Sequence, residues 1–195
     1  YILNVWDSEG VRYEKPKLKI MGIEAVKSST PAACRTSIKD CLKVIMNQDE
    51  EAAQKFIADF KEKFSSLPIE DISFPRGCNG INKWSHPATI YSKGTPIHVR
   101  GALLYNFYNK KNKLTHKYPL IQDGEKIKFV YLKTPNKINE NVISYLATFP
   151  KEFGLDKQVD YDLQFGKSFL DPIKVIMDVI GWQPEKIASL EFLFG

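Results

Sequence analysis

The segment Lys27-Ser28-Ser29-Thr30 has the clearest potential for binding chemistry in this sequence. Three hydroxyl side chains and a lysine directly precede Pro31, where a helical pattern begins. The free N–H groups and the positive dipole end of a helix N-terminus attract phosphate, and hydroxyl and ammonium groups add further donors. The segment therefore predicts either a phosphate site or a plain helix cap, and the residues taken alone favour the cap.

Lysines gather in two further places that would add phosphate contacts if they shared a face with this segment. The formal net charge of +5, from 28 Lys+Arg against 23 Asp+Glu, biases the protein mildly toward anionic partners. Both lysine sets are equally consistent with solvated surfaces. They are Lys15, Lys17 and Lys19 near the start of the chain, and Lys110, Lys111, Lys113 and Lys117 later in it.

The familiar signatures of a complete enzyme are missing from the sequence. It contains no P-loop, no GxGxxG, no HExxH and no GxSxG motif. His86, His98 and His116 have no metal-ligand spacing with one another or with the cysteines. Asp160 and Asp162 are better explained as acids at a helix start than as a catalytic pair. We therefore expect no catalytic centre, no metal site and no cofactor in this chain.

Composition indicates a folded protein from a reducing compartment. The chain is 43% hydrophobic and 12% aromatic, enough to bury a core. Its cysteines lack CxxC spacing, and Cys34 and Cys41 fall on one face of a predicted helix, as core thiols would. No apolar stretch is long enough for a membrane span and no leader opens the chain, so we expect a soluble, intracellular protein without a membrane partner. Because it opens at Tyr1 inside a strand pattern, we interpret it as a fragment or a split gene product.

Four segments have the apolar spacing of helices, and they are the elements that would position these residues. Thr30 precedes Pro31 and Thr95 precedes Pro96, which predicts in both places a capping residue followed by proline at the first helical position. The first two helices should form a hairpin. The four segments are residues 31–45, 53–64, 97–108 and 165–180.

Alternation and turn residues predict short antiparallel strands, so the expected fold class is α+β. A β-hairpin should join residues 119–121 to 126–132 through Gln122-Asp123-Gly124. After Gly181 the chain leaves the helical pattern, and residues 183–195 form a tail with large apolar side chains. The other strand candidates are residues 1–6, 11–13, 17–21 and 69–74.

Four stretches carry a family resemblance. They are KLKIMGIE (17–24), KSSTP (27–31), PIHVRG (96–101) with Leu104-Tyr105-Asn106, and ASLEFLFG (188–195). In this order and spacing they resemble the C-terminal region of T-even-type bacteriophage family B DNA polymerases. The opening residues 1–7 also resemble the palm strand that carries this family's Lys-Lys-x-Tyr motif, with Tyr1 in the tyrosine position. The resemblance covers nearly the whole chain and is weaker over residues 68–94 and 133–155.

The resemblance implies the last palm strands at residues 1–27, a mostly helical thumb at 28–182 and a clamp-binding tail at 183–195. The thumb of this family grips the primer-template duplex behind the active site. The residues carried over as DNA contacts are Tyr1, Lys17, Lys19, Lys27, Ser28, Ser29, Thr30, His98 and Arg100. Those that resemble the peptide bound by the sliding clamp are Leu190, Phe192, Leu193 and Phe194.

The same resemblance implies that catalysis belongs to other segments. The family's metal-binding aspartates and nucleotide-contacting fingers lie in earlier parts of the polymerase, so magnesium belongs to the complete enzyme and this chain alone is expected to be inactive. Its implied partners are the primer-template duplex, the sliding clamp and the exonuclease, fingers and catalytic palm, in the cytoplasm of the infected host. The alternatives are a non-enzymatic clamp-interacting or DNA-binding module and a small enzyme of unrecognised type.

Overall fold

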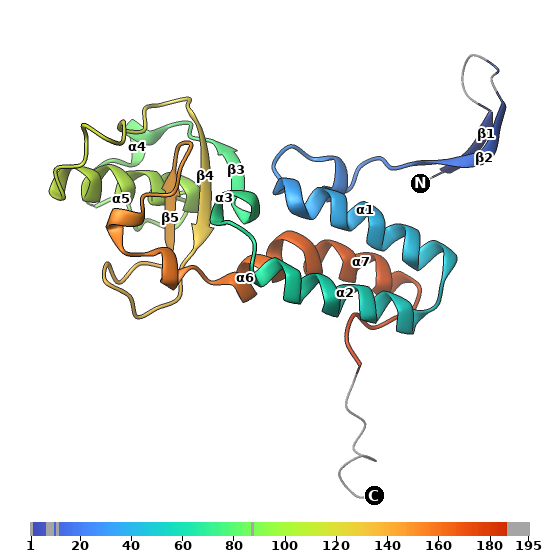
Figure 1. Ribbon diagram of the computed structural model, residues 1–195. Helices are drawn as coiled ribbons and strands as arrows, with labels where there is room; N and C mark the ends of the chain where they lie inside the picture. The colour runs from blue at the N-terminus through green and yellow to red at the C-terminus, as the bar shows by residue number, and fades with distance from the viewer. Residues whose placement is uncertain (1, 7–9, 11, 87, 187–195) are drawn as a thin grey trace, which may run out of the picture.

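The computed structural model describes residues 2–6, 10, 12–86 and 88–186. Its fold is α+β, as expected: a helical part and a part built on a small antiparallel sheet lie side by side (Figure 1). The buried side chains of both parts belong to one continuous core. The two parts therefore hold each other in place, and side chains from either can contribute to one surface.

An antiparallel ribbon opens the chain. It consists of β1 (Ile2–Trp6) and β2 (Arg12–Lys19), paired from Ile2 opposite Lys19 to Trp6 opposite Arg12, with an irregularity between Asn4 and Trp6. This confirms the predicted ribbon, although the two short strand candidates after the turn form one longer strand. A short 3₁₀ helix, η1 (Glu24–Val26), leads from the ribbon to the first long helix.

The helical part contains the predicted hairpin of α1 (Ala32–Asn47) and α2 (Glu50–Ser65), against which the last helix packs (Figure 1). Asp49 caps α2 by accepting a hydrogen bond from the amide of Ala52, at 2.9 Å. The last helix is α6 (Tyr161–Phe165), a π-helical segment η4 (Gly166–Leu170) and α7 (Asp171–Val179) in direct succession. Four phenylalanines join it to α2, with ring centroids 4.6–5.9 Å apart: Phe60, Phe64, Phe165 and Phe169.

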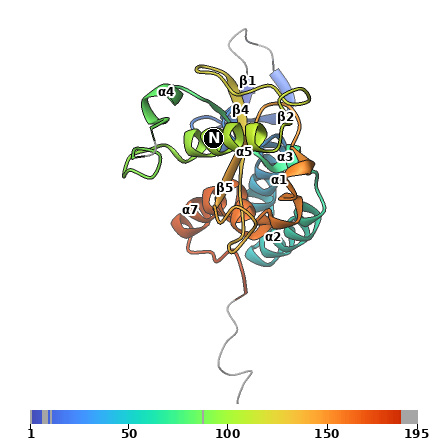
Figure 2. The same ribbon diagram turned by 90° about the vertical axis from the view of Figure 1, so that its left-hand side faces the viewer.

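The sheet part has the strand order β3-β4-β5, all antiparallel. The helix α5 (Ile97–Lys111) lies across this sheet and packs mainly on β5 (Figure 2). Short helical turns connect the remaining chain. The strands are β3 (Phe74–Gly77), β4 (Lys126–Tyr131) and β5 (Val142–Tyr145), and the turns are α3 (Ile69–Ile72), α4 (Ile81–Trp84), η2 (Lys151–Phe153) and η3 (Asp156–Gln158).

Two strand predictions were wrong. Residues 69–74 form the helical turn α3 after Pro68, and the strand begins only at Phe74. Residues 119–121 do not pair with β4, because the side-chain amide of Asn106 on α5 bonds both the N–H and the C=O of Ile121, at 2.8 and 2.9 Å. The partners of β4 are instead β3 and β5, so the predicted hairpin does not form.

The two threonine caps were also wrong, although both helices begin within one residue of the predicted start. Pro31 and Pro96 are themselves the N-cap residues, and neither helix has a side-chain cap. Thr30 is buried, 4% exposed, beneath the start of α1. The hydroxyl of Thr95 donates to the carbonyl of Thr89 at 2.7 Å, so it does not cap the first amides of α5.

The three cysteines are buried and free, which confirms the core position predicted for Cys34 and Cys41. Burial raises the pKa of Cys34 to about 11 and that of Cys41 to about 12. Burial, with the nearby acids Asp123 and Glu125, also raises the pKa of Cys78 to about 11. The thiols are thus protonated at neutral pH and poorly nucleophilic. Across the residues described here, no helix is long and apolar enough to cross a membrane.

Candidate nucleic-acid interface

The 27–30 turn links η1 to α1 and presents polar groups outward. Two backbone bonds close it: Lys27 N–H to the carbonyl of Glu24 and Thr30 N–H to the carbonyl of Lys27, both 3.2 Å. Lys27 and Ser28 are exposed and Ser29 is half-buried. The ammonium of Lys27 lies 2.7 Å from the carboxylate of Glu24, and this surface ion pair leaves the lysine about half exposed. The turn therefore offers a cation and two hydroxyls at the entrance to the helix.

The first turn of α1 supplies backbone donors beside this segment. Its first internal bond runs from Arg35 N–H to the carbonyl of Pro31, so the amides of Ala32, Ala33 and Cys34 have no intrahelical acceptor. No side chain caps them, and the first turn has no acidic residue. Uncapped amides at the positive end of a 16-residue helix favour an anion in this place.

Cations on α1 extend the positive surface away from the turn. A hollow of about 440 Å³ between η1 and α1 is lined by Arg35, Thr36 and Lys39. A second hollow of about 430 Å³ shares Thr36 and Lys39 and continues to Lys43, which pairs with Asp40 at 2.8 Å. Sequence reasoning missed these residues, although their spacing of four residues on a predicted helix is a signal that could have found them.

Arg76 on β3 is the second residue that sequence reasoning missed. Its guanidinium donates to the carbonyl of Ser29 at 2.7 Å and to that of Pro75 at 2.9 Å. The same group lies 5.8 Å from the ring centre of Phe74 and 6.0 Å from that of Phe129. Burial lowers the pKa of Arg76, but a guanidinium stays charged at neutral pH. This half-buried arginine fastens the 27–30 turn to the sheet, across 47 residues of sequence.

His98, which the resemblance implied as a DNA contact, lies beside Arg76 and Phe129 in the structure. Its ring lies 6.1 Å from that of Phe129, at the first turn of α5. Burial lowers its pKa, and repulsion from Arg76 lowers it further, against a smaller opposing effect of a hydrogen bond to the backbone of Gly77. The imidazole is consequently neutral at pH 7 and half-buried, so it contributes packing and hydrogen bonding here rather than charge.

We expect a titration of His98 to give a pKa below the ordinary value of about 6.5. Between the two values the unfolded chain holds a proton that the folded chain does not, so the free energy of unfolding falls as pH drops below about 6.5. NMR of the ring protons measures the pKa directly. In Arg76→Gln, where the repelling charge is gone, the pKa should move upward; an unchanged value would contradict the role given to Arg76.

The structure does not bring every proposed contact to this cluster. Arg100 donates to the side chain of Asn141 at 2.7 Å, and its buried Nε has no partner within the described residues. Lys17 and Lys19 lie on β2, ahead of η1. The 110–117 lysines lie at the opposite end of α5 from His98, and Lys117 forms an ion pair with Glu152. Tyr1 and the four clamp-peptide residues, Leu190, Phe192, Leu193 and Phe194, lie outside the described residues.

Sequence comparison supplies the context for this cluster. Over 199 aligned positions that take in all of this chain, it is 31% identical to the DNA-directed DNA polymerase of Enterobacteria phage T4 and 33% identical to that of Escherichia phage RB69. The chain is related to T4-type phage DNA polymerases along its whole length. It spans 22% of the length of each relative. No family model matches it.

The 27–30 turn, the open amides of α1 and the cations Arg35 and Lys39 lie next to one another. Together they make one surface that is rich in hydrogen-bond donors and positive charge.

Proposed function

We propose that this chain is the thumb and C-terminal region of a T4-type phage DNA polymerase, which holds the primer-template duplex by its phosphate backbone. The observation that carries the proposal is the 27–30 turn. Its Lys27 and Ser28 are exposed, it precedes three uncapped helix amides, and Arg76 bonds the carbonyl of Ser29. The relationship to the phage polymerases over the full chain supports duplex DNA as the ligand.

The residues of the cluster divide into contact and positioning roles. Lys27 and Ser28 are exposed and would donate to phosphate oxygens directly, with the amides of α1 behind them. Arg76 is turned inward toward Ser29 O and the rings of Phe74 and Phe129, so it positions the turn. Because these groups would bind phosphates, which carry no sequence information, we expect binding to be independent of sequence.

The chemistry of nucleotide addition belongs, in this proposal, to other polymerase segments. Magnesium in the complete enzyme would stabilise charge on the transferred phosphoryl group. Among the described residues, no three His, Cys, Asp or Glu side chains come together as a metal site. In this proposal the contribution of this chain is to hold the duplex while exonuclease, fingers and catalytic palm act.

The apolar tail is proposed to carry a second interaction. The sequence around Leu190, Phe192, Leu193 and Phe194 resembles the sliding-clamp peptide of the family, and several large apolar side chains so close together favour docking into a partner's pocket. The proposed place of action is the phage-infected bacterial cell. The DNA contact and the clamp contact then lie on separate parts of the chain, so each can be tested alone.

Replacing Lys27 with alanine is expected to weaken duplex binding about three- to ten-fold, equally for unrelated sequences. One phosphate contact is lost, so the slope of log affinity against log salt becomes shallower by roughly one unit. Fluorescence anisotropy with labelled primer-template measures both quantities. The titration should cover about 50 to 200 mM salt, the range over which affinity that depends on phosphate contacts falls steeply.

The matched control is Lys111→Ala, which removes the same charge from an exposed site at the far end of α5. It should leave affinity and slope nearly unchanged. A strong preference of the unmodified chain for one sequence, or equal losses in the two variants, would contradict the proposed interface.

A further inference from the structure

The lysines at the C-terminal end of α5 take no part in the proposed duplex interface. Lys110 and Lys111 end the helix and Lys113 follows it, and all three are exposed. Lys117 is paired with Glu152, but none of the other three has an ion-pair partner within the described residues. Three unpaired cations so close together repel one another, so they favour an anionic partner at this end of the helix.

An exposed aromatic ring lies among these lysines. The side chain of Phe107 is 58% exposed, so it contributes little to the core. Its ring meets that of Tyr108 edge to face, with the ring centroids 5.1 Å apart. The ammonium of Lys111 lies 5.9 Å from the centre of the first ring and 5.7 Å from that of the second, within cation–π distance. These contacts orient Phe107 and leave much of its surface open to a ligand.

A hollow of about 380 Å³ opens beside this ring, between α5, residues 120–122 and the neighbouring α4 (Figure 2). Phe107 supplies an aromatic surface to its lining and Lys110 supplies a cation, whereas Lys111, turned toward the two rings, is not in the lining. Asn82 and Gln122, both exposed, add side-chain amides. The lining thus combines an aromatic ring and a positive charge, the two groups that bind an unpaired nucleotide.

Two acids lie close to the hollow, but they do not cancel its positive charge. Asp123 accepts a hydrogen bond from the N–H of Ile81 at 2.9 Å, and Glu125 accepts one from the N–H of Gln122 at 2.6 Å. Lys83, exposed on α4, adds a fourth cation to the three at the end of α5. Four lysines against two acids leave this surface positive.

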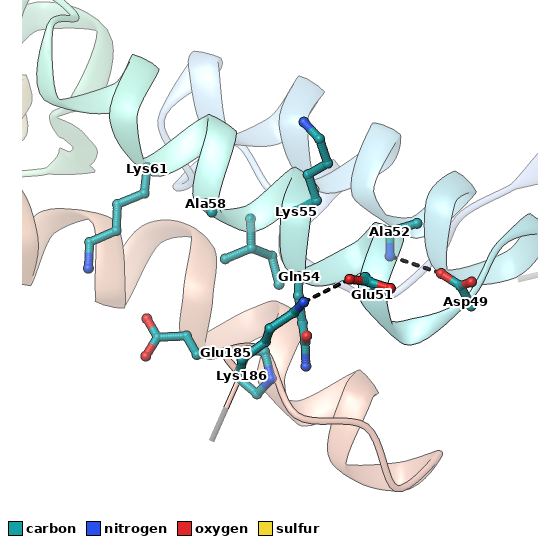
Figure 3. A pocket seen from close by; sticks show the side chains of 11 residues that line it. Asp49, Glu51, Ala52, Gln54, Lys55, Ala58, Lys61, Glu185 and Lys186 are labelled. Carbon is teal, nitrogen blue, oxygen red and sulfur yellow. Dashed lines mark hydrogen bonds and ion pairs between the residues drawn. The ribbon is translucent and has the colours of Figure 1, made fainter. Parts of the chain in front are cut away.

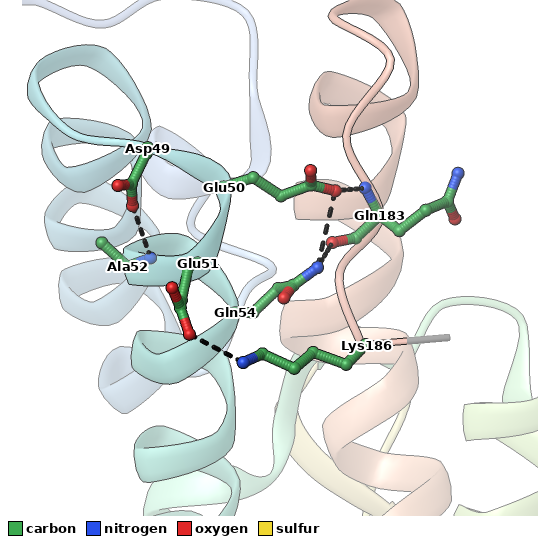
Figure 4. A network of polar contacts seen from close by, with 7 residues as sticks. All are labelled: Asp49, Glu50, Glu51, Ala52, Gln54, Gln183 and Lys186. Atoms are coloured by element: carbon green, nitrogen blue, oxygen red, sulfur yellow. Dashed lines mark hydrogen bonds and ion pairs between the residues drawn. The ribbon is translucent and has the colours of Figure 1, made fainter. Parts of the chain in front are cut away.

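A second hollow, beside α2, does not suit a nucleic acid (Figure 3). It is larger, about 710 Å³, but the described residues of its lining include as many acids as lysines and no aromatic ring. The chain after α7 forms part of its wall and is bonded to α2 through Gln183 and Lys186 (Figure 4). The charged residues of this lining are Lys55, Lys61, Lys186, Asp49, Glu51 and Glu185. An exposed aromatic ring and an excess of positive charge therefore distinguish the hollow beside Phe107.

We propose that the hollow beside Phe107 binds an unpaired DNA strand, with a base stacked on the ring and the adjoining phosphate on Lys110. Bases in a duplex already stack on their neighbours, so an exposed aromatic ring selects a single strand. The relationship to DNA-directed DNA polymerases supports DNA as the strand, and the inference rests on the proposed function only for this choice. The site is separate from the duplex interface, because Phe107 lies nine residues after His98, about 14 Å along α5.

A tryptophan in place of Phe107 tests the stacking directly, because an indole ring that stacks on a base loses fluorescence. Phe107→Trp should bind a thymidine DNA oligonucleotide of about 12 nucleotides at least as tightly as the unmodified chain does, and its fluorescence should fall on binding. The matched control is Val179→Trp, at an exposed position on α7. Its fluorescence should fall no more than that of the unmodified chain, which reports the background from Trp84.

Anisotropy of the labelled oligonucleotide, with excess blunt duplex to occupy the other interface, measures the two proposed contacts. Phe107→Leu keeps an apolar side chain but removes the aromatic surface, so affinity should fall about five- to ten-fold. Lys110→Ala should lower affinity about three-fold and make the slope of log affinity against log salt shallower by roughly 0.7, the value for one phosphate of a single strand. The charge control, Lys174→Ala on α7, should change neither quantity. Circular dichroism of each variant verifies folding.

Failure of this site can be told apart from failure of the duplex interface. Excess blunt duplex should not reverse the quenching in Phe107→Trp, and adding Lys27→Ala to that variant should leave the quenching midpoint nearly unchanged. Equal affinities of Phe107→Leu and the unmodified chain, or equal quenching in the two tryptophan variants, would overturn the proposal. Tighter binding of a uridine RNA oligonucleotide than of the DNA strand would assign the hollow to RNA and overturn the choice of DNA.

Discussion

Replacing Gly101 with alanine is expected to destabilise the fold by about 3 kcal/mol, the upper end of the usual cost of overpacking a core. A Cβ atom at this position would lie 2.5 Å from Oγ of Ser144, 2.9 Å from its backbone nitrogen and 3.1 Å from the carbonyl carbon of Ile143. Rotation of the serine can relieve only the first contact. The other two involve the backbone of β5, so the helix must move off the sheet.

The clash also disturbs a hydrogen bond that joins the two elements. The hydroxyl of Ser144 donates to the carbonyl of His98 at 2.7 Å, in the first turn of α5. Alanine has a better helix propensity than glycine by about 1 kcal/mol, but this gain does not offset the displaced backbone. Because His98 moves with α5, duplex affinity should fall together with stability.

Urea unfolding followed by circular dichroism measures the loss as a lower midpoint. Gly166→Ala is the matched control, because it lies in the last helix with nothing within 4 Å of the added Cβ. Its stability should stay the same or rise by up to about 1 kcal/mol. Equal midpoints for the two variants would show that α5 and β5 are less closely packed than described.

Helix starts were the part of the fold most accessible from sequence. Proline after threonine marked both α1 and α5 to within one residue, because proline's fixed φ suits a helix entrance. Whether Thr30 and Thr95 cap these helices could not be predicted in the same way. Whether a hydroxyl caps a helix depends on where it points after packing, and Thr30 is buried while Thr95 bonds Thr89.

Strand pairing was less predictable because its partners are distant in sequence. The strand β4 was recognised from its own alternation, but its neighbour β3 comes from about 50 residues earlier and contains a proline. Local reasoning chose the nearest segment, residues 119–121, whose bonding capacity is taken by Asn106. Tertiary contacts with α5 decided the outcome, and no local pattern encodes them.

In the candidate site, too, local patterns could be recognised from sequence and tertiary contacts could not. Residues 27–30 were singled out from local chemistry, since a lysine and hydroxyls before a helix are a recognisable phosphate pattern, and their role stays a prediction. Arg76 was missed, because a single arginine between proline and glycine carries no signal until folding brings it to Ser29. Arg100 shows the converse: it is only two residues from His98, but on a helix that spacing turns the side chains to different faces.

Deleting residues 190–195 is expected to abolish binding to the sliding clamp of the same phage, by at least about 100-fold. Truncating a single hot-spot residue costs on the order of 1–3 kcal/mol, and the deletion removes Leu190, Phe192 and Phe194 together. The described residues before the deletion, Gln183 to Lys186, are bonded to α2 through Gln183 and Lys186 and offer the clamp no replacement anchor.

Thermal stability should hardly change in the same variant, because the described core is complete without the tail. The last helix is joined to α2 by the phenylalanine cluster, and Ile173 and Met177 of α7 are fully buried. A change of about 1 kcal/mol would shift the melting temperature by roughly 2–4 °C in a chain of this size, and we expect the shift to be no larger than that. Duplex affinity should be unaffected, since the cluster around Lys27 is built from other elements.

The decisive measurement pairs a clamp titration with a melting curve for the intact and shortened chains. The triple variant Leu190→Ala, Phe192→Ala, Phe194→Ala serves as the matched control, because it keeps the length and the charge of the tail while removing its anchors. It should lose clamp binding as fully as the deletion does. A large drop in melting temperature with clamp binding retained would mean that these side chains belong to the core of the protein, and the clamp assignment would then fail.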